Sequence, residues 1–222
     1  MAITLSGPML APANGGPPDA AAVLLHGYGS DGHDLIALAP HWQGLLPGAL
    51  FVSPHAPEPA AMTGFGHQWF ALDWAGDRLA SRQIGVAGAR PVLAGFLEAL
   101  WEQTGVAPGR TLLAGFSQGA MMALHVGLSL PEDRCLMGVI GFSGAFVPPE
   151  GFGGPGLARP PVCLVHGELD EVVDPALSAE AERVLRAAGV SVAHHVSRGT
   201  AHGIAPDGLA FATDFIARLV AK

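Results

Sequence analysis

Thr111-Leu-Leu-Ala-Gly-Phe-Ser-Gln-Gly-Ala-Met-Met-Ala-Leu124 is the stretch of sequence that decides the fold. It opens with an apolar run typical of a buried strand and continues as an Ala- and Met-rich run typical of a helix. Between them, Gly115-Phe-Ser117-Gln-Gly119 predicts a tight, strained turn, where small residues flank the serine because backbone segments nearly touch. Such a turn places Ser117 at the carboxyl edge of a sheet and at the start of a helix. The alternative is a plain strand-to-helix connection, since glycine and serine also mark ordinary turns.

Short apolar runs alternate with longer helical segments along the rest of the chain. This alternation predicts an α/β fold with a mostly parallel central sheet and helices on both faces. The predicted strands are residues 21–25, 49–52, 111–116, 136–142, 161–165 and 190–196. The predicted helices are residues 34–46, 90–103, 118–130, 176–188 and 209–219. Glycine and proline concentrate in residues 10–18 and 146–161, which we expect to be irregular surface excursions.

The composition suits a compact enzyme that buries much of its sheet. Half of the 222 residues are hydrophobic and 14% are charged, so we expect one domain spanning residues 1–222. The formal net charge is -8 and the lone lysine is Lys222. Because no basic stripe could recruit a phosphate backbone, nucleic acid is not an expected partner.

The N-terminal residues Met1-Ala-Ile-Thr-Leu-Ser-Gly-Pro8 lack the positive region and continuous apolar core of a signal peptide. No apolar run approaches membrane-spanning length. We therefore expect a cytoplasmic protein without stable membrane insertion, either a monomer or a homodimer. Cys135 and Cys163 lie in apolar, strand-like contexts, which predicts buried free thiols rather than a disulfide or a nucleophile.

A nucleophilic serine at such a turn needs an acid and then a histidine downstream. Pro161-Val-Cys-Leu-Val-His-Gly-Glu-Leu-Asp170 is an apolar strand followed by a loop that carries an aspartate. Glu168, Glu171 and Asp174 compete with Asp170 on composition alone. Asp174 precedes a proline and suits a helix N-cap better.

His202 is the best candidate for the base. It lies in Ser197-Arg-Gly-Thr-Ala-His202-Gly-Ile, between the last predicted strand and the last predicted helix, on a loop that reaches the sheet edge of Ser117. The other histidines are expected to pack or to lie at the surface: His26, His33, His41, His55, His67, His125, His166, His194 and His195. Asp31 and Asp34 lie close to His26 and His33, but no chelating spacing or paired-cysteine motif appears, so we expect no metal and no cofactor.

Catalysis by serine also requires N–H donors aimed at the developing oxyanion, one after the nucleophile and one from an earlier loop. The candidates are the backbone amides of Gln118 and Tyr28. The stretch Leu24-Leu-His-Gly-Tyr28-Gly-Ser-Asp-Gly follows the first predicted strand, and its glycines allow the backbone at Tyr28 to turn inward. Its glycine spacing matches neither a dinucleotide-binding motif nor a P-loop. Since only the amide of Gln118 is involved, Gln118→Ala is expected to be mild.

With these residues in view, the sequence resembles the phospholipase/carboxylesterase family, small α/β hydrolases that include bacterial carboxylesterases and acyl-protein thioesterases. Seven blocks occur where that family's motifs do: Leu25-His-Gly-Tyr-Gly-Ser-Asp-Gly32, Pro54-His-Ala-Pro57, Trp69-Phe70, Gly115-Phe-Ser-Gln-Gly119, Phe142-Ser-Gly144, His166-Gly-Glu-Leu-Asp-Glu-Val-Val173 and Ala201-His-Gly203. Tyr28 stands where the family often has leucine, and His55 where it more commonly has asparagine. Both departures bear on substrate specificity rather than on mechanism.

The resemblance implies an α/β-hydrolase fold with Ser117, Asp170 and His202 as a catalytic triad, which selects Asp170 among the competing acids. It also implies an oxyanion hole built from the amides of Tyr28 and Gln118. The expected activity is that of a serine carboxylesterase, a carboxylic ester hydrolase that cleaves small or short-chain esters through an acyl-enzyme. An acyl-protein thioesterase or lysophospholipase would use the same triad, and a hydrolase-like protein that only binds a ligand is the non-enzymatic alternative.

The substrate pocket is expected to draw on apolar side chains near this constellation. The candidates are Phe65, Trp69, Phe70, Leu72, Trp74, Phe146 and Val147. Packing in the core is an equally good interpretation for each of them taken singly.

Overall fold

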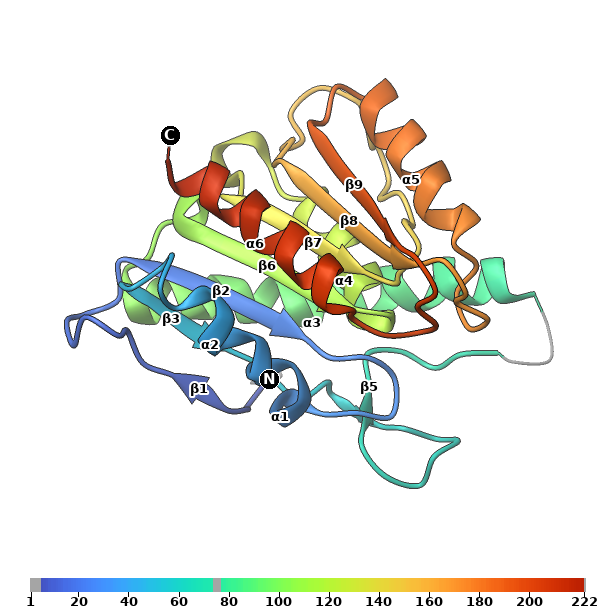
Figure 1. The fold of residues 1–222 in the computed structure, drawn as a ribbon, viewed down its shortest axis with the longest axis horizontal. Helices are drawn as coiled ribbons and strands as arrows, with labels where there is room; N and C mark the ends of the chain where they lie inside the picture. Colours follow the sequence, from blue (N-terminus) through green and yellow to red (C-terminus); the bar gives the residue numbers. More distant parts are fainter. Residues whose placement is uncertain (1–4, 74–76, 222) are drawn as a thin grey trace.

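The computed structural model describes residues 5–73 and 77–221, and its centre is a seven-stranded sheet (Figure 1). The strand order is β1-β3-β2-β6-β7-β8-β9. Neighbouring strands run parallel except β1, which pairs antiparallel with β3 at one edge. The strands are β1 (Met9–Leu10), β2 (Ala20–Leu25), β3 (Ala49–Val52), β6 (Thr111–Phe116), β7 (Gly138–Phe142), β8 (Val162–Gly167) and β9 (Val192–Ser197). A separate antiparallel pair is formed by β4 (Glu58–Pro59) and β5 (His67–Gln68).

Helices cover both faces of this sheet, so the predicted α/β class is confirmed. Figure 1 shows α1, α2 and α6 in front of the sheet and α3 and α4 behind it. The helical segments are α1 (Gly32–Leu35), η1 (Ile36–Leu38), α2 (Ala39–Trp42), α3 (Arg78–Thr104), η2 (Pro108–Arg110), α4 (Gln118–Gly127), η3 (Glu132–Arg134), α5 (Ala176–Ala187) and α6 (Pro206–Val220), where η marks a 3-10 helix.

The hydrophobic core is divided by the sheet into two clusters, one on each face. Successive side chains of a strand point to opposite faces, and β2 therefore contributes to both clusters. Ala21, Val23 and Leu25 pack with the α3 and α4 side. Ala20, Ala22 and Leu24 pack with the α2 and α6 side. The uniformly apolar sequence of β2 follows from this double burial.

Two predicted helices differ from the observed ones. The helix predicted at 90–103 begins at Arg78, where Asp77 caps it by accepting hydrogen bonds from the amides of Leu79 and Ala80. Pro91 lies inside this helix, although proline is favoured in a first turn. The helix predicted at 34–46 is three short segments, with Pro40 in the first turn of α2.

The 27-residue α3 has the length and apolarity of a membrane-spanning helix, although the sequence analysis expected no such run. This is weak evidence for insertion, since buried core helices have the same properties. Its residues Val86, Leu93 and Leu97 are fully buried in the cluster that α4 shares. Cys135 and Cys163 are free thiols, as predicted, but Cys163 is buried whereas Cys135 is only partly buried. Burial raises the pKa of Cys163 to about 12.

Candidate active site

Ser117 lies in a strained turn between β6 and α4, at the carboxyl edge of the sheet. Its backbone angles are φ 53° and ψ -115°, in a region that residues with a side chain rarely adopt. The flanking glycines are required by close backbone packing. A Cβ on Gly115 would lie 2.3 Å from the carbonyl carbon of Gly119, and a Cβ on Gly119 would lie 2.0 Å from the carbonyl oxygen of Leu25. The turn is therefore the one that the sequence predicts.

A chain of two hydrogen bonds connects Ser117, His202 and Asp170. The Oγ of Ser117 lies 2.9 Å from Nε2 of His202, and Nδ1 of His202 lies 2.7 Å from Oδ2 of Asp170. His202 lies on the loop between β9 and α6, and its ring packs against Phe116, with centroids 4.8 Å apart. With Asp170 accepting from Nδ1–H, Nε2 is left as the acceptor that faces the serine hydroxyl.

Asp170 is held from three sides on the loop after β8. Its Oδ1 accepts hydrogen bonds from the amides of Val172 and Val173, both at 2.9 Å. Burial by itself would raise the pKa of Asp170, but the hydrogen bonds from His202, Val173 and Val172 outweigh it and lower the pKa below its ordinary value. Asp170 is therefore a carboxylate that orients the His202 ring.

The competing acids have other partners. Asp174 accepts a hydrogen bond from the amide of Ala176 at the start of α5, the capping role that the sequence predicts. The carboxylate of Glu168 accepts from the amide of Gly199. Glu171 is exposed. Among these neighbouring acids, Asp170 is the one bonded to His202.

His166 is an additional group beneath the acid, although the sequence suggested only a packing role. Its Nε2 lies 2.8 Å from the carbonyl oxygen of Val173 and 3.2 Å from Oδ2 of Asp170. Burial lowers the pKa of His166, so the ring is neutral at pH 7 and its Nε2–H donates toward both oxygens. A histidine at the end of a strand, four residues before the acid, is the signal that could have revealed this role.

The loop after β2 brings Tyr28 beside the nucleophile. A Cβ on Gly27 would lie 3.4 Å from Cβ of Ser117, so the backbone immediately before Tyr28 touches the elbow. Buried His26 fixes this loop, because its Nδ1 lies 2.7 Å from the Gly27 carbonyl oxygen and its Nε2 accepts from the amide of Ala56. Burial lowers the pKa of His26, which keeps the ring neutral. His26 is thus a positioning residue that sequence reasoning treated as packing.

The side chain of Gln118 has a structural role that the sequence analysis missed. Its Oε1 accepts a hydrogen bond from the amide of Trp69 at 2.8 Å, and its Nε2 donates to the carbonyl oxygen of Phe70 at 2.7 Å. The side chain is fully buried. Gln118 therefore ties the first residue of α4 to the segment after β5. The expectation that Gln118→Ala is mild took account of the backbone amide alone, and these two side-chain bonds lead us to predict a larger effect.

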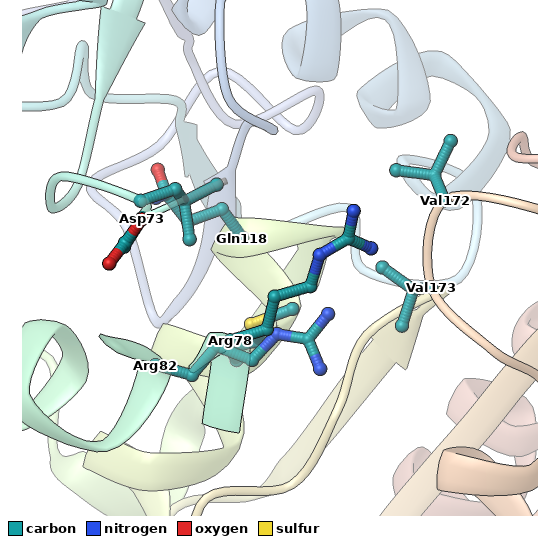
Figure 2. A pocket seen from close by; sticks show the side chains of 8 residues that line it. Asp73, Arg78, Arg82, Gln118, Val172 and Val173 are labelled. Atoms are coloured by element: carbon teal, nitrogen blue, oxygen red, sulfur yellow. The ribbon is translucent and has the colours of Figure 1, made fainter. Parts of the chain in front are cut away.

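A narrow pocket adjoins the hydrogen-bonded chain (Figure 2). Gln118 and Met121 of α4 form one side, and Val172 and Val173 form another. The other lining residues are Leu72, Asp73, Arg78 and Arg82. The space between these side chains is about 420 Å³, part of it open to solvent. Gln118 follows Ser117 in the chain and the two valines bind Asp170, so the pocket is lined by direct neighbours of the hydrogen-bonded chain.

A second, mostly apolar crevice lies on the other side of His202. It is lined by Asp34, Leu35, Ala37, Leu38, Phe116, His202, Gly203 and Ile204. The first hollow is therefore lined by Gln118, next to Ser117 in the chain, and the second by His202 itself.

The predicted pocket residues are distributed over several places. Leu72 lines the pocket, whereas Trp69 and Phe70 are buried in the core, Trp69 donating through Nε1 to the carbonyl oxygen of His26. Phe65 is 72% exposed. Phe146 packs edge-on against Phe152, and Val147 lines a different hollow beside His125 and Arg90. Trp74 lies outside the described residues.

Met121, Val172 and Val173 line the pocket and were not predicted to do so. Met121 follows Ser117 by one helical turn, and this spacing was a usable signal. Within residues 5–73 and 77–221, no group of three or more His, Cys, Asp or Glu side chains could hold a metal ion.

Comparisons with known proteins place the chain in a family. A model of the Phospholipase/Carboxylesterase family matches residues 12–220. The curated Esterase YpfH of Escherichia coli (strain K12) is 29% identical over 208 residues, which cover 93% of this chain and 85% of that protein. The solved structure of esterase PE8 is 47% identical, with a TM-score of 0.92, and covers 98% of this chain and 100% of its own. The Bacillus cereus carboxylesterase is 20% identical, with a TM-score of 0.79 and coverage of 97% and 94%, and this likeness concerns the fold alone.

Proposed function

The chain belongs to the phospholipase/carboxylesterase family and is a carboxylic ester hydrolase, and we propose that it is a serine carboxylesterase with Ser117, His202 and Asp170 as its triad. The observation that carries this proposal is the continuous hydrogen-bonded chain from Ser117 Oγ through His202 to Asp170 Oδ2. An unused serine hydroxyl would have no need of a histidine oriented by a carboxylate.

In the proposed cycle, Nε2 of His202 takes the hydroxyl proton while Oγ of Ser117 attacks the ester carbonyl carbon. Asp170 stabilises the imidazolium that forms. The amides of Tyr28 and Gln118 donate to the oxyanion, and the intermediate collapses when His202 returns the proton to the leaving alcohol oxygen. Water, deprotonated by His202, then attacks the acyl-enzyme and releases the carboxylic acid and the free serine.

We propose small or short-chain esters as substrates. The pocket beside Gln118 is narrow, and Met121 and Leu72 occupy part of its lining. Comparing kcat/KM for p-nitrophenyl esters of increasing chain length tests this, and a short acyl-thioester measured alongside separates ester from thioester preference. A steady rise toward long chains would contradict the proposal and favour a lysophospholipase or a thioesterase of long acyl groups.

The decisive experiment is Ser117→Ala, assayed with p-nitrophenyl acetate and with a fluorophosphonate probe. We expect turnover to fall on the order of a million-fold, by analogy with deletions of other serine triads, and labelling to disappear. Ser143→Ala is the matched control. Ser143 also has a positive φ, of 48°, at the end of the neighbouring β7, but it is buried and its Oγ has no hydrogen-bond partner among the described residues. Retained hydrolysis in Ser117→Ala, or its loss in folded Ser143→Ala, would contradict the assignment.

A further inference from the structure

Two guanidinium groups project into the pocket beside Ser117, and the proposed ester hydrolysis uses neither of them. Arg78 and Arg82 both line this pocket. They lie four residues apart at the start of α3, so their side chains occupy the same face of the helix. In Figure 2 both side chains extend from α3 toward Val172 and Val173, the residues that bind Asp170.

This placement opposes the local electrostatics in three ways. Like charges at this helical spacing repel each other. The N-terminal end of a helix carries a partial positive charge and favours acidic rather than basic side chains. Burial, and then the neighbouring charge of Arg78, lower the pKa of Arg82. The position of Arg82 is therefore electrostatically unfavourable within the described residues.

Most other arginines of the described residues are engaged, and Arg82 is not. Four of them form ion pairs: Arg110 with Asp19, Arg134 with Glu98, Arg183 with Glu180, and Arg186 with Glu182. The guanidinium of Arg82 forms no ion pair or hydrogen bond with any residue in the described ranges. A cation that faces a pocket without a counterion can bind an anion at little cost in rearrangement.

The described acidic groups near Arg82 form no ion pair with it. Asp73 lines the same pocket, but in Figure 2 its carboxylate is turned away from both guanidinium groups. Asp170, Glu171 and Asp174 line an adjoining hollow with the two arginines. Asp170 is bonded to His202, whereas Glu171 and Asp174 are exposed, where solvent and salt screen their charge.

We propose that the physiological ester carries a second, negatively charged group, a carboxylate or a phosphate, which Arg78 and Arg82 bind. This inference rests on the proposed function, because Ser117 and Asp170 place the pocket at the reaction centre. The planar guanidinium matches carboxylate and phosphate oxygens with paired N–H donors. Leu72 and Met121 provide an apolar lining for the hydrocarbon between the ester and the charge. A monoester of a short dicarboxylic acid is the simplest compound of this class.

The test compares monoethyl glutarate with ethyl 5-methylhexanoate, a neutral ester of similar length and branching, and with a matching phosphonate ester. We expect Arg82→Gln to lower kcat/KM about tenfold for the charged ester, and the double variant with Arg78→Gln about a hundredfold, since each change removes a charge-assisted contact. The neutral ester should change less than about twofold. Arg110→Gln, which removes a surface charge at the opposite end of β6, should leave both rates unchanged. Whichever anionic ester depends more on the arginines identifies the charged group.

The outcomes separate this inference from the proposed function. Equal losses of kcat/KM on the charged and the neutral ester would mean that the arginines only support the fold. An unchanged kcat/KM for the charged ester in the double variant would mean that they bind no anion. Either result overturns the inference while Ser117-dependent hydrolysis of the neutral ester continues. Failure of the wild-type protein to hydrolyse any of these esters would instead count against the proposed function. Competitive inhibition of neutral-ester hydrolysis by glutarate, but not by neutral glutaramide, is expected without any variant, and its absence also contradicts the inference.

Discussion

Two segments that meet at the pocket are built in opposite ways. The elbow segment, residues 115–119, is held by backbone atoms that nearly touch, with Gly119 against the carbonyl oxygen of Leu25. The wall segment, residues 58–73 and 77–82, includes exposed Met62 and Phe65, and a Cβ on Gly64 would meet nothing within 4 Å. The comparison indicates that close backbone packing fixes the elbow segment, whereas residues 61–65 of the wall segment are exposed and tolerate change more easily.

The same substitution in the two segments should give the largest contrast. In Gly119→Ala the new methyl group meets buried backbone, so we expect a loss of roughly 3 kcal/mol or more in the free energy of unfolding, with esterase activity lost too. In Gly64→Ala the space is open and only the positive φ of 71° opposes the change, which costs about 1 kcal/mol. Denaturant unfolding and p-nitrophenyl acetate hydrolysis measure both variants. Similar losses of stability and activity in Gly119→Ala and Gly64→Ala would show that the two segments do not differ in their backbone packing.

Gln118→Ala tests the connection between the segments and should have the next largest effect. It leaves the amide of Trp69 and the carbonyl oxygen of Phe70 buried without partners, which we expect to lower the free energy of unfolding by about 2–3 kcal/mol. Because Phe70 leads into the pocket wall, KM should rise together with the fall in stability. Gln43→Ala, whose side chain makes one bond at the surface, is the control and should change stability by less than about 0.5 kcal/mol. An equally small effect for Gln118→Ala would show that the two segments are independent.

Three buried histidines should make the free energy of unfolding sensitive to acid. Burial lowers the pKa of His26, His125 and His166 below 6.5, so the unfolded chain binds more protons than the folded one below that pH. Their contribution to stability is complete above pH 6.5 and decreases as the pH falls below it, by at most about 1.4 kcal/mol per pH unit for each histidine.

Denaturant unfolding on either side of pH 6.5 measures this slope. His125→Gln should make the slope shallower, because it removes one of the three groups. Gln43→Ala should leave the slope unchanged, because it removes no titratable group. A stability that does not change with pH in this range would show that these rings are protonated as easily in the folded as in the unfolded chain.

The elbow segment was predictable from sequence because its constraints are local. Backbone crowding demands glycine at 115 and 119, and an apolar strand and a helix flank them within a few residues. Asp170 and His202 were likewise predictable as positions, because the carboxyl ends of parallel strands meet at one edge of a sheet. The hydrogen bonds that join Ser117, His202 and Asp170 could be found only in the three-dimensional structure.

The wall segment was not predictable, because its contacts join residues far apart in the chain. Gln118 bonds residues 69 and 70, about fifty positions earlier, and no local pattern encodes that pairing. Arg78 and Arg82 were missed because the predicted helix began at residue 90, whereas α3 begins at Arg78, so their shared helical face was not recognised. The single-domain organisation, the compartment and the oligomeric state stay predictions.

The two hydrogen bonds of the Gln118 side chain have a consequence for protein engineering. A library that mutates Trp69 or Phe70 to enlarge the substrate range also disturbs the residue that follows the nucleophile, so selectivity and turnover change together. Whereas Trp69 and Phe70 are buried in the core, Leu72 and Val172 line the pocket directly and receive no such bonds from α4. Directed evolution should therefore begin at these two positions, where a new substrate can be accommodated while the elbow stays intact.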